Sequence, residues 1–377
     1  MKKTFIPQTD PKAGYLAQKA DIDAAVARVL ESGWYILGQE VRLFESEFSE
    51  YIGTKYAAGV ASGTDAIEIA LRACDIGDGD LVFTVSHTAV ATVAAIERAG
   101  AKAVFVDIDP DSFTMDSDHL ESVIKSMGNN SYGHPKAIIP VHLYGSPAEM
   151  SSIMEIAQRY GLYVIEDCAQ AHGAQLKGQM AGTFGDLAAF SFYPTKNIGT
   201  FGDGGIVTTD NKDLYKKLLA LRQYGWEERY ISSVPGINSR LDEIQAAILR
   251  VKLKSLDVDN SKRRKIAEAY TKAIDNADFK APKERTGIYH VYHQYVIRTE
   301  ERQRFIDYLK ELSIGSTIHY PLPVHMQPAY KEGLGGEWKL NNTEKVCAEI
   351  VSLPMFPQLS AEDTDRIVDA LKSYRSR

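Results

Sequence analysis

The sequence predicts an α/β protein with a mostly parallel central sheet and a smaller C-terminal α/β domain. From about residue 57 to residue 209, short runs of β-branched and aromatic residues alternate with segments of helical periodicity. This alternation is typical of a parallel sheet whose two faces are covered by helices. After about residue 250 the pattern changes to long polar helices. We therefore expect a large domain over residues 1–250, with an N-terminal arm, and a small domain over residues 251–377.

The large domain begins with two predicted helices. Apolar residues recur at helical spacing over residues 21–32 and 40–51, and Gly33 ends the first pattern. The alternation that follows is carried by segments 57–80 (strand, turn, helix), 81–100 (strand, helix), 102–109 (strand), 136–145 (strand), 150–160 (helix) and 163–170 (strand). The runs in 186–196 and 204–210 predict two further strands on either side of a glycine-rich loop.

The small domain is predicted from a different pattern of polar and apolar residues. Long polar helices are expected over residues 251–276, a strand over 292–298 and a helix over 301–312. The proline-rich stretch "STIHYPLPVH" is expected to be irregular. Ser360 predicts the N-cap of a last helix, with an acidic residue at the capping-box distance.

Composition excludes several classes of protein. The 377 residues are 44% hydrophobic and 25% charged, as in ordinary soluble globular proteins. A net charge of −7 disfavours a nucleic-acid partner, and we interpret the short basic run at 261–265 as a solvated helix surface. The N-terminal segment has no apolar stretch behind its lysines, so we expect neither a secretory signal nor a membrane span. The cysteines, Cys74, Cys168 and Cys347, are too distant for a disulfide framework or a zinc site, which fits the cytoplasm.

An acidic residue and a lysine stand out at the ends of predicted strands. Asp167 ends the strand in "YVIEDCAQAHGA", where ligands of parallel sheets bind. Lys196 follows 29 residues later, among glycines and after Pro194. A desolvated lysine amine is a nucleophile toward carbonyls, and an aldehyde cofactor held by it needs an anionic partner for its ring nitrogen. The alternatives are a helix N-cap for Asp167 and a solvated surface amine for Lys196.

A phosphate site is predicted at the start of the helix in "ASGTDAIEIAL". Ser62, Gly63 and Thr64 lie between a strand and a helix, and the free N–H groups at a helix N-terminus bind phosphate. Ser191, five residues before Lys196, is a further donor. The alternative for the S-G-T sequence is a common helix start, and the alternative for Ser191 is an ordinary hydroxyl on a strand. The chain order of phosphate site, acid and lysine is more specific.

At these residues the sequence resembles the DegT/DnrJ/EryC1/StrS family of sugar aminotransferases, which depend on pyridoxal 5′-phosphate. The resemblance covers almost the whole chain. It rests on "GQEVRLFESEFSEYIG", "SGTDAIEIAL", "PVHLYG", "IEDCAQAHGA", "SFYPTKNIGTFGDGG", "LRQYG", "GINSRLDEIQAAIL" and "HYPLPVH". It implies the aspartate-aminotransferase fold, fold type I of the pyridoxal-phosphate enzymes, and a homodimer with shared active sites.

The resemblance also implies roles for individual residues. Lys196 would be the Schiff-base lysine, Asp167 the partner of the ring nitrogen, and Gln170 would face the phenolic oxygen of the ring. The phosphate would be held by Gly63, Thr64 and Ser191, and by Asn238 across the dimer. The alternative for Asn238 is a residue at a helix start.

The sequence departs from the family at the position of the aromatic residue that commonly stacks on the cofactor, which is Ala89 here. We expect His87 to contact the cofactor or the substrate instead. The alternative is a structural histidine at a strand end. Four residues are expected in the substrate cleft, with packing roles as the alternative: Tyr35, His319, Tyr320 and His325.

The implied reaction moves an amino group from L-glutamate to a nucleotide-linked keto-sugar. The segments "SHTAVATVAAIE" and "YPTKN" most resemble enzymes that aminate C3 of a dTDP-linked 3-keto-6-deoxyhexose. Enzymes acting on UDP- or GDP-linked 4-keto sugars are the alternative. A dehydratase is disfavoured because such relatives commonly carry histidine where Lys196 stands. A non-catalytic regulator or sugar-binding protein would not need both Lys196 and Asp167.

Overall fold

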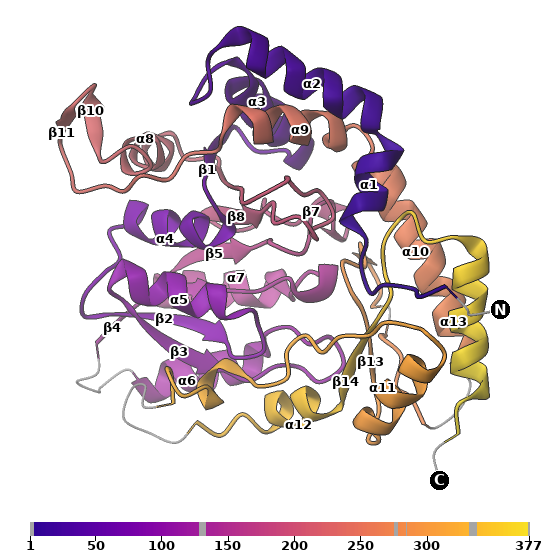
Figure 1. Cartoon of the computed structure of the whole chain (residues 1–377). Coiled ribbons are helices and arrows are strands. Elements are labelled where there is room, and N and C mark those ends of the chain that lie inside the picture. Colours follow the sequence, from indigo (N-terminus) through magenta and orange to yellow (C-terminus); the bar gives the residue numbers. More distant parts are fainter. Residues whose placement is uncertain (1–3, 128–132, 275–277, 284, 332–337, 376–377) are drawn as a thin grey trace.

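The computed structural model describes residues 4–127, 133–274, 278–283, 285–331 and 338–375. Figure 1 shows a large layered body, with a smaller group of helices and strands beside it at the lower right. The helices of the large body are α1 (Pro11–Ala17), α2 (Lys19–Ser32), α3 (Gln39–Ile52), α4 (Gly63–Ala73), α5 (Val90–Ala99), α6 (Ser117–Met127), α7 (Met150–Tyr160), α8 (Lys212–Leu221) and α9 (Glu243–Leu253). None of the helices in the described ranges is long and apolar enough to cross a membrane.

A seven-stranded sheet forms the centre of the large body. Its strands are β1 (Tyr56–Val60), β2 (Asp80–Val85), β3 (Lys102–Val106), β4 (His134–Ile139), β5 (Tyr163–Asp167), β8 (Leu187–Ser191) and β9 (Gly205–Thr209). They lie in the order β1-β9-β8-β5-β4-β2-β3, and only β9 runs antiparallel to its neighbours. The prediction of a mostly parallel sheet is confirmed.

Alternate residues of the strands enter two different cores. Leu187 and Ala189 of β8 pack with α4, α5 and α8, whereas Ala188 and Phe190 pack with α3 and α9. Helices α6 and α7 cover the rest of that second face, over β2, β3 and β4. Side chains of a strand alternate between its faces, so nearly continuous apolar runs are the expected pattern for strands covered on both sides.

The smaller group of elements has a core of its own. It contains α10 (Leu256–Ala273), α11 (Arg302–Glu311), α13 (Ala361–Ser373) and the antiparallel pair β13 (Tyr295–Arg298) and β14 (Ile350–Leu353). Ile6 also lies in this core and pairs with Ile314, so the N-terminal segment crosses to the small body. The predicted domain boundary at residue 250 falls inside α9.

The helices predicted over 251–276 are present within the described residues, where α9 ends at Leu253 and α10 begins at Leu256. Residues 275 and 276 lie outside the described residues. The strand predicted over 292–298 contains only the four residues of β13.

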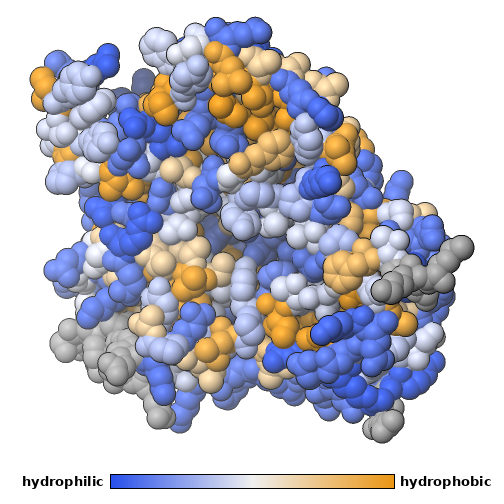
Figure 2. Space-filling view, viewed as in Figure 1, coloured by the Kyte–Doolittle hydropathy of each residue, from blue (hydrophilic) through white to orange (hydrophobic). Residues whose placement is uncertain are grey.

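Several short elements complete the chain. They are α12 (Asn341–Glu349), the strands β6 (Gln175–Leu176), β7 (Gln179–Met180) and β12 (Ile288–Tyr289), and the hairpin β10 (Trp226–Glu228) with β11 (Ile231–Ser232). Figure 1 shows this hairpin projecting from the upper left of the large body, and Figure 2 shows hydrophobic side chains on that projection.

Candidate active site

The candidate site lies at the carboxyl ends of β5 and β8. These two strands are parallel neighbours, with Asp167 opposite Ala189, so Asp167 and the loop after Ser191 leave the sheet at the same edge. Ligands of such sheets bind at this edge. The sheet therefore brings the predicted acid and the predicted lysine to one place.

The loop that carries Lys196 is closed by its own backbone. The Lys196 amide donates to the Tyr193 carbonyl at 2.9 Å, and the Thr200 amide and hydroxyl both donate to the Phe192 carbonyl. A Cβ at Gly199 would lie 2.7 Å from the Tyr193 oxygen, so only glycine fits this turn. The tight closure fixes where the lysine side chain starts.

The Lys196 side chain is partly buried, and its ε-amine makes no hydrogen bond to any residue in the described ranges. Burial lowers the pKa of Lys196 to about 8, and the negative charge of Asp167 acts in the opposite direction. A larger fraction of Lys196 is therefore neutral near physiological pH than of an ordinary lysine. The amine is uncommitted and suited to attack a carbonyl.

Asp167 is buried and held from two sides. Thr92, in the first turn of α5, donates its hydroxyl to Oδ2 at 2.8 Å, and the Ala169 amide donates to Oδ1 at 3.1 Å. Burial raises the pKa of Asp167, while these two hydrogen bonds and the positive charge of Lys196 lower it. A second cation, such as a protonated ring nitrogen, would further favour the carboxylate form.

Gln170 joins the acid's loop to two tyrosines. Its Oε1 accepts from the Tyr144 amide at 2.7 Å, and its Nε2 donates to the Tyr320 hydroxyl at 3.1 Å. Burial raises the pKa of Tyr320 to about 12, and the nearby Asp167 charge adds to the effect. Asp167, Gln170 and Tyr320 therefore form one group.

The start of α4 forms the predicted anion cradle. Ser62 caps the helix by accepting from the Asp65 amide at 3.1 Å, and the amides of Gly63 and Thr64 have no acceptor in the described chain. A Cβ at Gly63 would lie 2.5 Å from Cβ of Ser191. The helix start thus presses against the end of β8, which brings two free amides and the Ser191 hydroxyl together.

His87 differs from the sequence prediction of a cofactor or substrate contact. Its ring is completely buried. Nδ1 lies 3.1 Å from the Cys347 sulfur and Nε2 lies 2.8 Å from the Tyr144 hydroxyl. Burial lowers the pKa of His87 to about 3. Because both nitrogens have partners, these contacts favour the alternative of a structural histidine.

His319 and Tyr320, two of the predicted substrate residues, lie near the lysine and the acid respectively, and His325 does not. Burial and the positive charge of Lys196 lower the pKa of His319 to about 4, and His319 is followed by Tyr320 of the Gln170 group. His325 is instead buried against Ser86, 2.7 Å from its Oγ, and its other nitrogen faces Glu344. These contacts favour a packing role for His325.

Tyr35 and Asn238 are both exposed on the surface, and none of their contacts in the described chain reaches Lys196. The Tyr35 carbonyl accepts from the Glu243 amide, and its neighbour Ile36 pairs with Asp242. Asn238 is exposed and pairs with Gln223. The two residues therefore face away from their own chain's core, where another molecule can meet them.

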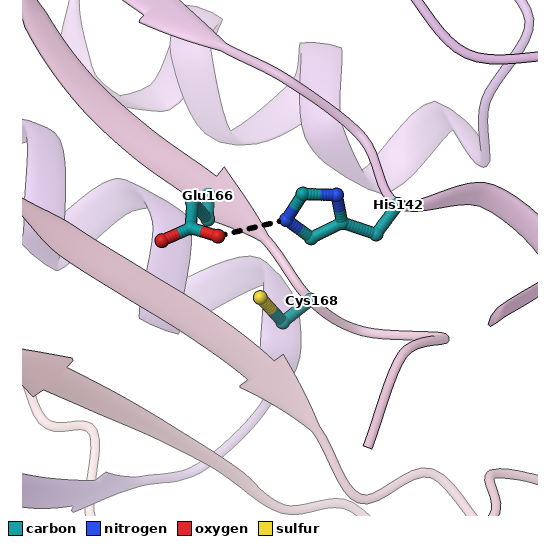
Figure 3. Close-up of side chains that lie close together, drawn as sticks. All are labelled: His142, Glu166 and Cys168. Carbon is teal, nitrogen blue, oxygen red and sulfur yellow. Dashed lines mark hydrogen bonds and ion pairs between the residues drawn. The ribbon is translucent and has the colours of Figure 1, made fainter. Parts of the chain in front are cut away.

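A second polar cluster lies beneath the site. Figure 3 shows His142 and Glu166 pointing toward one another, with Cys168 beside them. His142 Nδ1 accepts from the Ala148 amide, so Nε2 carries the proton and donates to Glu166 at 2.9 Å. Glu166 also accepts from the amides of Gly182, Phe184 and Gly185. Burial raises the pKa of the Cys168 thiol, and the ligand atoms of His142 and Glu166 are already engaged, so we interpret the cluster as structural.

The residues at this edge fit pyridoxal 5′-phosphate. The free amides of the helix start suit its phosphate, the buried carboxylate suits its ring nitrogen, and the uncommitted amine suits its aldehyde. Ala89, which stands where an aromatic residue is common, is partly exposed at the start of α5.

Sequence reasoning missed three supporting residues. Thr92 lies seven residues beyond the end of β2, which also ends at this edge. Tyr144 has a φ of +59°, rare for a residue with a side chain, and joins Gln170 to His87. Asn197, the residue after Lys196, donates its side-chain amide to Asn260 and to the Val291 carbonyl. The position of Thr92 in the first turn of a helix after a strand was the available signal.

We expect Asp167→Asn to lower the pKa of Lys196 below about 8, because the Asp167 charge raises that pKa against the effect of burial. The measurement is the pH dependence of Lys196 reductive methylation in cofactor-free protein, followed by peptide mass spectrometry. Lys252 is an internal reference, since burial alone lowers its pKa to about 8. Asp203→Asn, at an exposed position nearby in the sequence, is the matched control. An unchanged Lys196 midpoint in Asp167→Asn would contradict the coupling.

Comparisons with known proteins agree with this geometry. The model of the DegT/DnrJ/EryC1/StrS aminotransferase family matches residues 17–372. The chain is 45% identical to a dTDP-3-amino-3,6-dideoxy-alpha-D-galactopyranose transaminase of Aneurinibacillus thermoaerophilus, over 98% of this chain and 99% of that one. It is 42% identical to a pleiotropic regulatory protein of Geobacillus stearothermophilus, over 98% of both chains.

The solved structures lead to the same family. DesV of S. venezuelae, in complex with a ketimine intermediate, matches with a TM-score of 0.94 and 41% identity over 98% of both chains. The fold predicted from the resemblance is confirmed by this match. With its lysine, acid and helix start at one sheet edge, the chain belongs to the DegT/DnrJ/EryC1/StrS aminotransferase family and is a pyridoxal 5′-phosphate-dependent aminotransferase.

Proposed function

We propose that this aminotransferase moves an amino group from L-glutamate to C3 of a dTDP-linked 3-keto-6-deoxyhexose. The observation that carries the catalytic part is the uncommitted amine of Lys196 beside the buried carboxylate of Asp167. The sugar is supported by the relative from A. thermoaerophilus, whose name specifies a 3-amino sugar linked to dTDP.

Bound at this edge, pyridoxal 5′-phosphate supplies an aldehyde that takes up the amino group and a ring that withdraws electrons from the reacting carbon. Lys196 would hold the aldehyde end and Asp167 the ring nitrogen. Gln170 would face the phenolic oxygen, a role supported by its position in the acid's loop and its hydrogen bond to Tyr320. The amides of Gly63 and Thr64 and the Ser191 hydroxyl would hold the phosphate.

Lys196 has a second role in this proposal, as the group that moves the proton at the reacting carbon. An amine with a pKa of about 8 is able both to take up and to release a proton near neutral pH. Proton transfer by a positioned side chain typically contributes about 10²–10⁴-fold to the rate. Asp167 contributes by keeping the ring nitrogen protonated.

His319 and Tyr320 are the residues we propose for the sugar. Both lie near Lys196 and Asp167, in the irregular proline-rich segment of the small body. Neutral imidazole and phenol groups suit the hydroxyls of a sugar, since each is able to donate or accept a hydrogen bond. His325 is not part of this proposal because it is turned toward Ser86.

We also propose a cytoplasmic homodimer with shared active sites. Large apolar side chains are exposed along two segments, at Trp34, Tyr35, Ile36, Tyr224, Tyr230, Ile231 and Val234. Tyr35 lies in the first segment and Asn238 follows the second, and Ile36 of the first segment pairs with Asp242. Exposed apolar patches of this kind mark interfaces. A second copy seated there would bring Asn238 to its partner's phosphate site.

The cytoplasmic assignment is supported by the cysteines. Cys74, Cys168 and Cys347 are free and buried, as expected for a protein of a reducing compartment.

The first prediction of this function concerns the cofactor. The purified protein should be yellow, and borohydride should bleach it and fix the cofactor on Lys196, as read by peptide mass spectrometry. Lys196→Ala should abolish transamination and keep the thermal unfolding transition. A Lys196→Ala protein that transfers amino groups at the full rate would rule out the catalytic assignment. A colourless protein that binds no cofactor would favour a regulatory role.

A second prediction concerns the sugar. In the reverse direction with 2-oxoglutarate, a dTDP-linked 3-amino-6-deoxyhexose should be turned over faster than dTDP-, UDP- or GDP-linked 4-amino sugars. The measurement is glutamate formation across the panel, with kcat/KM as the readout. Equal turnover of the 4-amino sugars would reject the choice of C3.

A third prediction concerns the dimer. Ile231 is 61% exposed at the tip of the β10–β11 hairpin, and Ile231→Asp should convert the dimer to a monomer in light scattering. Val258→Asp is the matched control, since Val258 is 59% exposed on α10, which lies on the other side of the molecule (Figure 1). If both variants stay dimeric, the hairpin is not part of the interface.

A further inference from the structure

Asn260 connects the two segments that carry the candidate catalytic residues. It lies on α10, outside the large sheet, and is 1% exposed. Its Oδ1 accepts from Nδ2 of Asn197 at 2.7 Å, and its Nδ2 donates to the His172 carbonyl at 2.9 Å. Asn197 follows Lys196 directly, and His172 lies in the turn that begins at Asp167. One side-chain amide therefore spans both segments.

The orientation of the Asn260 amide is fixed by its neighbours. Asn197 also donates from Nδ2 to the Val291 carbonyl at 3.2 Å, and its Oδ1 lies 3.1 Å from Nδ1 of His293. With both Asn197 amide hydrogens donated, the group facing them on Asn260 must be an acceptor, and the opposite group must donate to the His172 carbonyl. The network has no alternative arrangement of equal quality.

The backbone beside His172 is shaped to receive Asn260. Gly173 has a φ of +86°, and a Cβ there would lie 2.8 Å from Nδ2 of Asn260 and 2.6 Å from the Tyr51 hydroxyl. Tyr51 in turn donates to Asp257, one turn before Asn260 on the same helix. This close approach is independent of the hydrogen bonds and shows that α10 is tightly seated on the turn after Asp167.

The turn between Asp167 and His172 is short and internally bonded. The Ala169 amide donates to the Asp167 carboxylate, and the Ala171 amide donates to the Cys168 carbonyl. A displacement of the His172 carbonyl would therefore be transmitted to the carboxylate. On the other side, Asn197 moves with Lys196 because the two residues are adjacent in a closed loop.

We propose that Asn260 is a positioning residue that sets the separation between Lys196 and Asp167 by binding both of their segments at once. The proposal rests on the roles proposed above for these two residues, which the borohydride experiment tests separately on the unaltered protein. Asn260 touches neither residue, so its effect would be on geometry and not on binding of the sugar.

The test uses the holoenzyme of Asn260→Leu, a neutral variant of similar size that makes neither hydrogen bond. The first readout is the midpoint of the pH titration of the cofactor's visible absorbance. We expect it to fall by about 0.5 unit or more, because a greater separation weakens the effect of Asp167 on the nitrogen of Lys196. The second readout is steady-state kinetics, where kcat should fall about 10–100-fold, as expected for a small misplacement, while KM changes little.

Tyr270→Phe is the matched control. Tyr270 is buried on the same helix, in the core of the small body, and donates one hydrogen bond to a backbone carbonyl, that of Pro354. The Tyr270→Phe substitution should lower the melting temperature without moving the absorbance midpoint. If Asn260→Leu does not fold, the absorbance midpoint and kcat of Asn260→Ala are compared with those of Tyr270→Phe instead. An unmoved midpoint, a kcat that falls only with the folded fraction, or a failure of both Asn260 variants to fold would overturn the proposal.

Discussion

The ε-amine of Lys196 is held partly out of water, close enough to Asp167 for the two charges to act on each other, and the chemistry of the site depends on that pairing. Burial favours the neutral form of both groups, and each charge partly restores the charged form of the other. A lysine with a pKa of about 8 is reactive near neutral pH, whereas a fully solvated one is not. The site would lose this property if either side chain were free to move into solvent.

The fold provides the pairing through contacts that leave little room for variation. Strands β5 and β8 are neighbours in the sheet, and the α4 start is pressed against Ser191 through Gly63. The loop of Lys196 closes on itself and is then tied to the rest of the protein through Asn197. The central sheet, the start of α4 and the small-body helix α10 thus meet at one edge. This meeting explains why the site needs elements from so much of the chain.

The sequence predicted the parts of this arrangement that follow from local pattern. Strand and helix periodicity located the sheet, and the order of helix start, acid and lysine located the site. The position of the helix break between Leu253 and Leu256 does not follow from the sequence, because the polar periodicity continues across it. The roles of Thr92 and Tyr144 depend on side chains that meet only after folding. A histidine at a strand end, such as His87, or in a proline-rich loop, such as His325, looks the same in sequence whether it faces a ligand or fills a core. Burial and the hydrogen-bond partners of the ring nitrogens distinguish the two cases.

The burial of all three cysteines has a practical consequence. Cys74 and Cys347 have their pKa raised to about 12 by burial, and that of Cys168 is raised as well, so none offers a reactive thiolate at neutral pH. Maleimide dyes should therefore leave the unaltered protein unlabelled. A single cysteine introduced on the surface would then be the sole attachment point for a fluorophore or spin label. Distances between the labels on two copies of the chain could then be measured in solution without first replacing the three native cysteines.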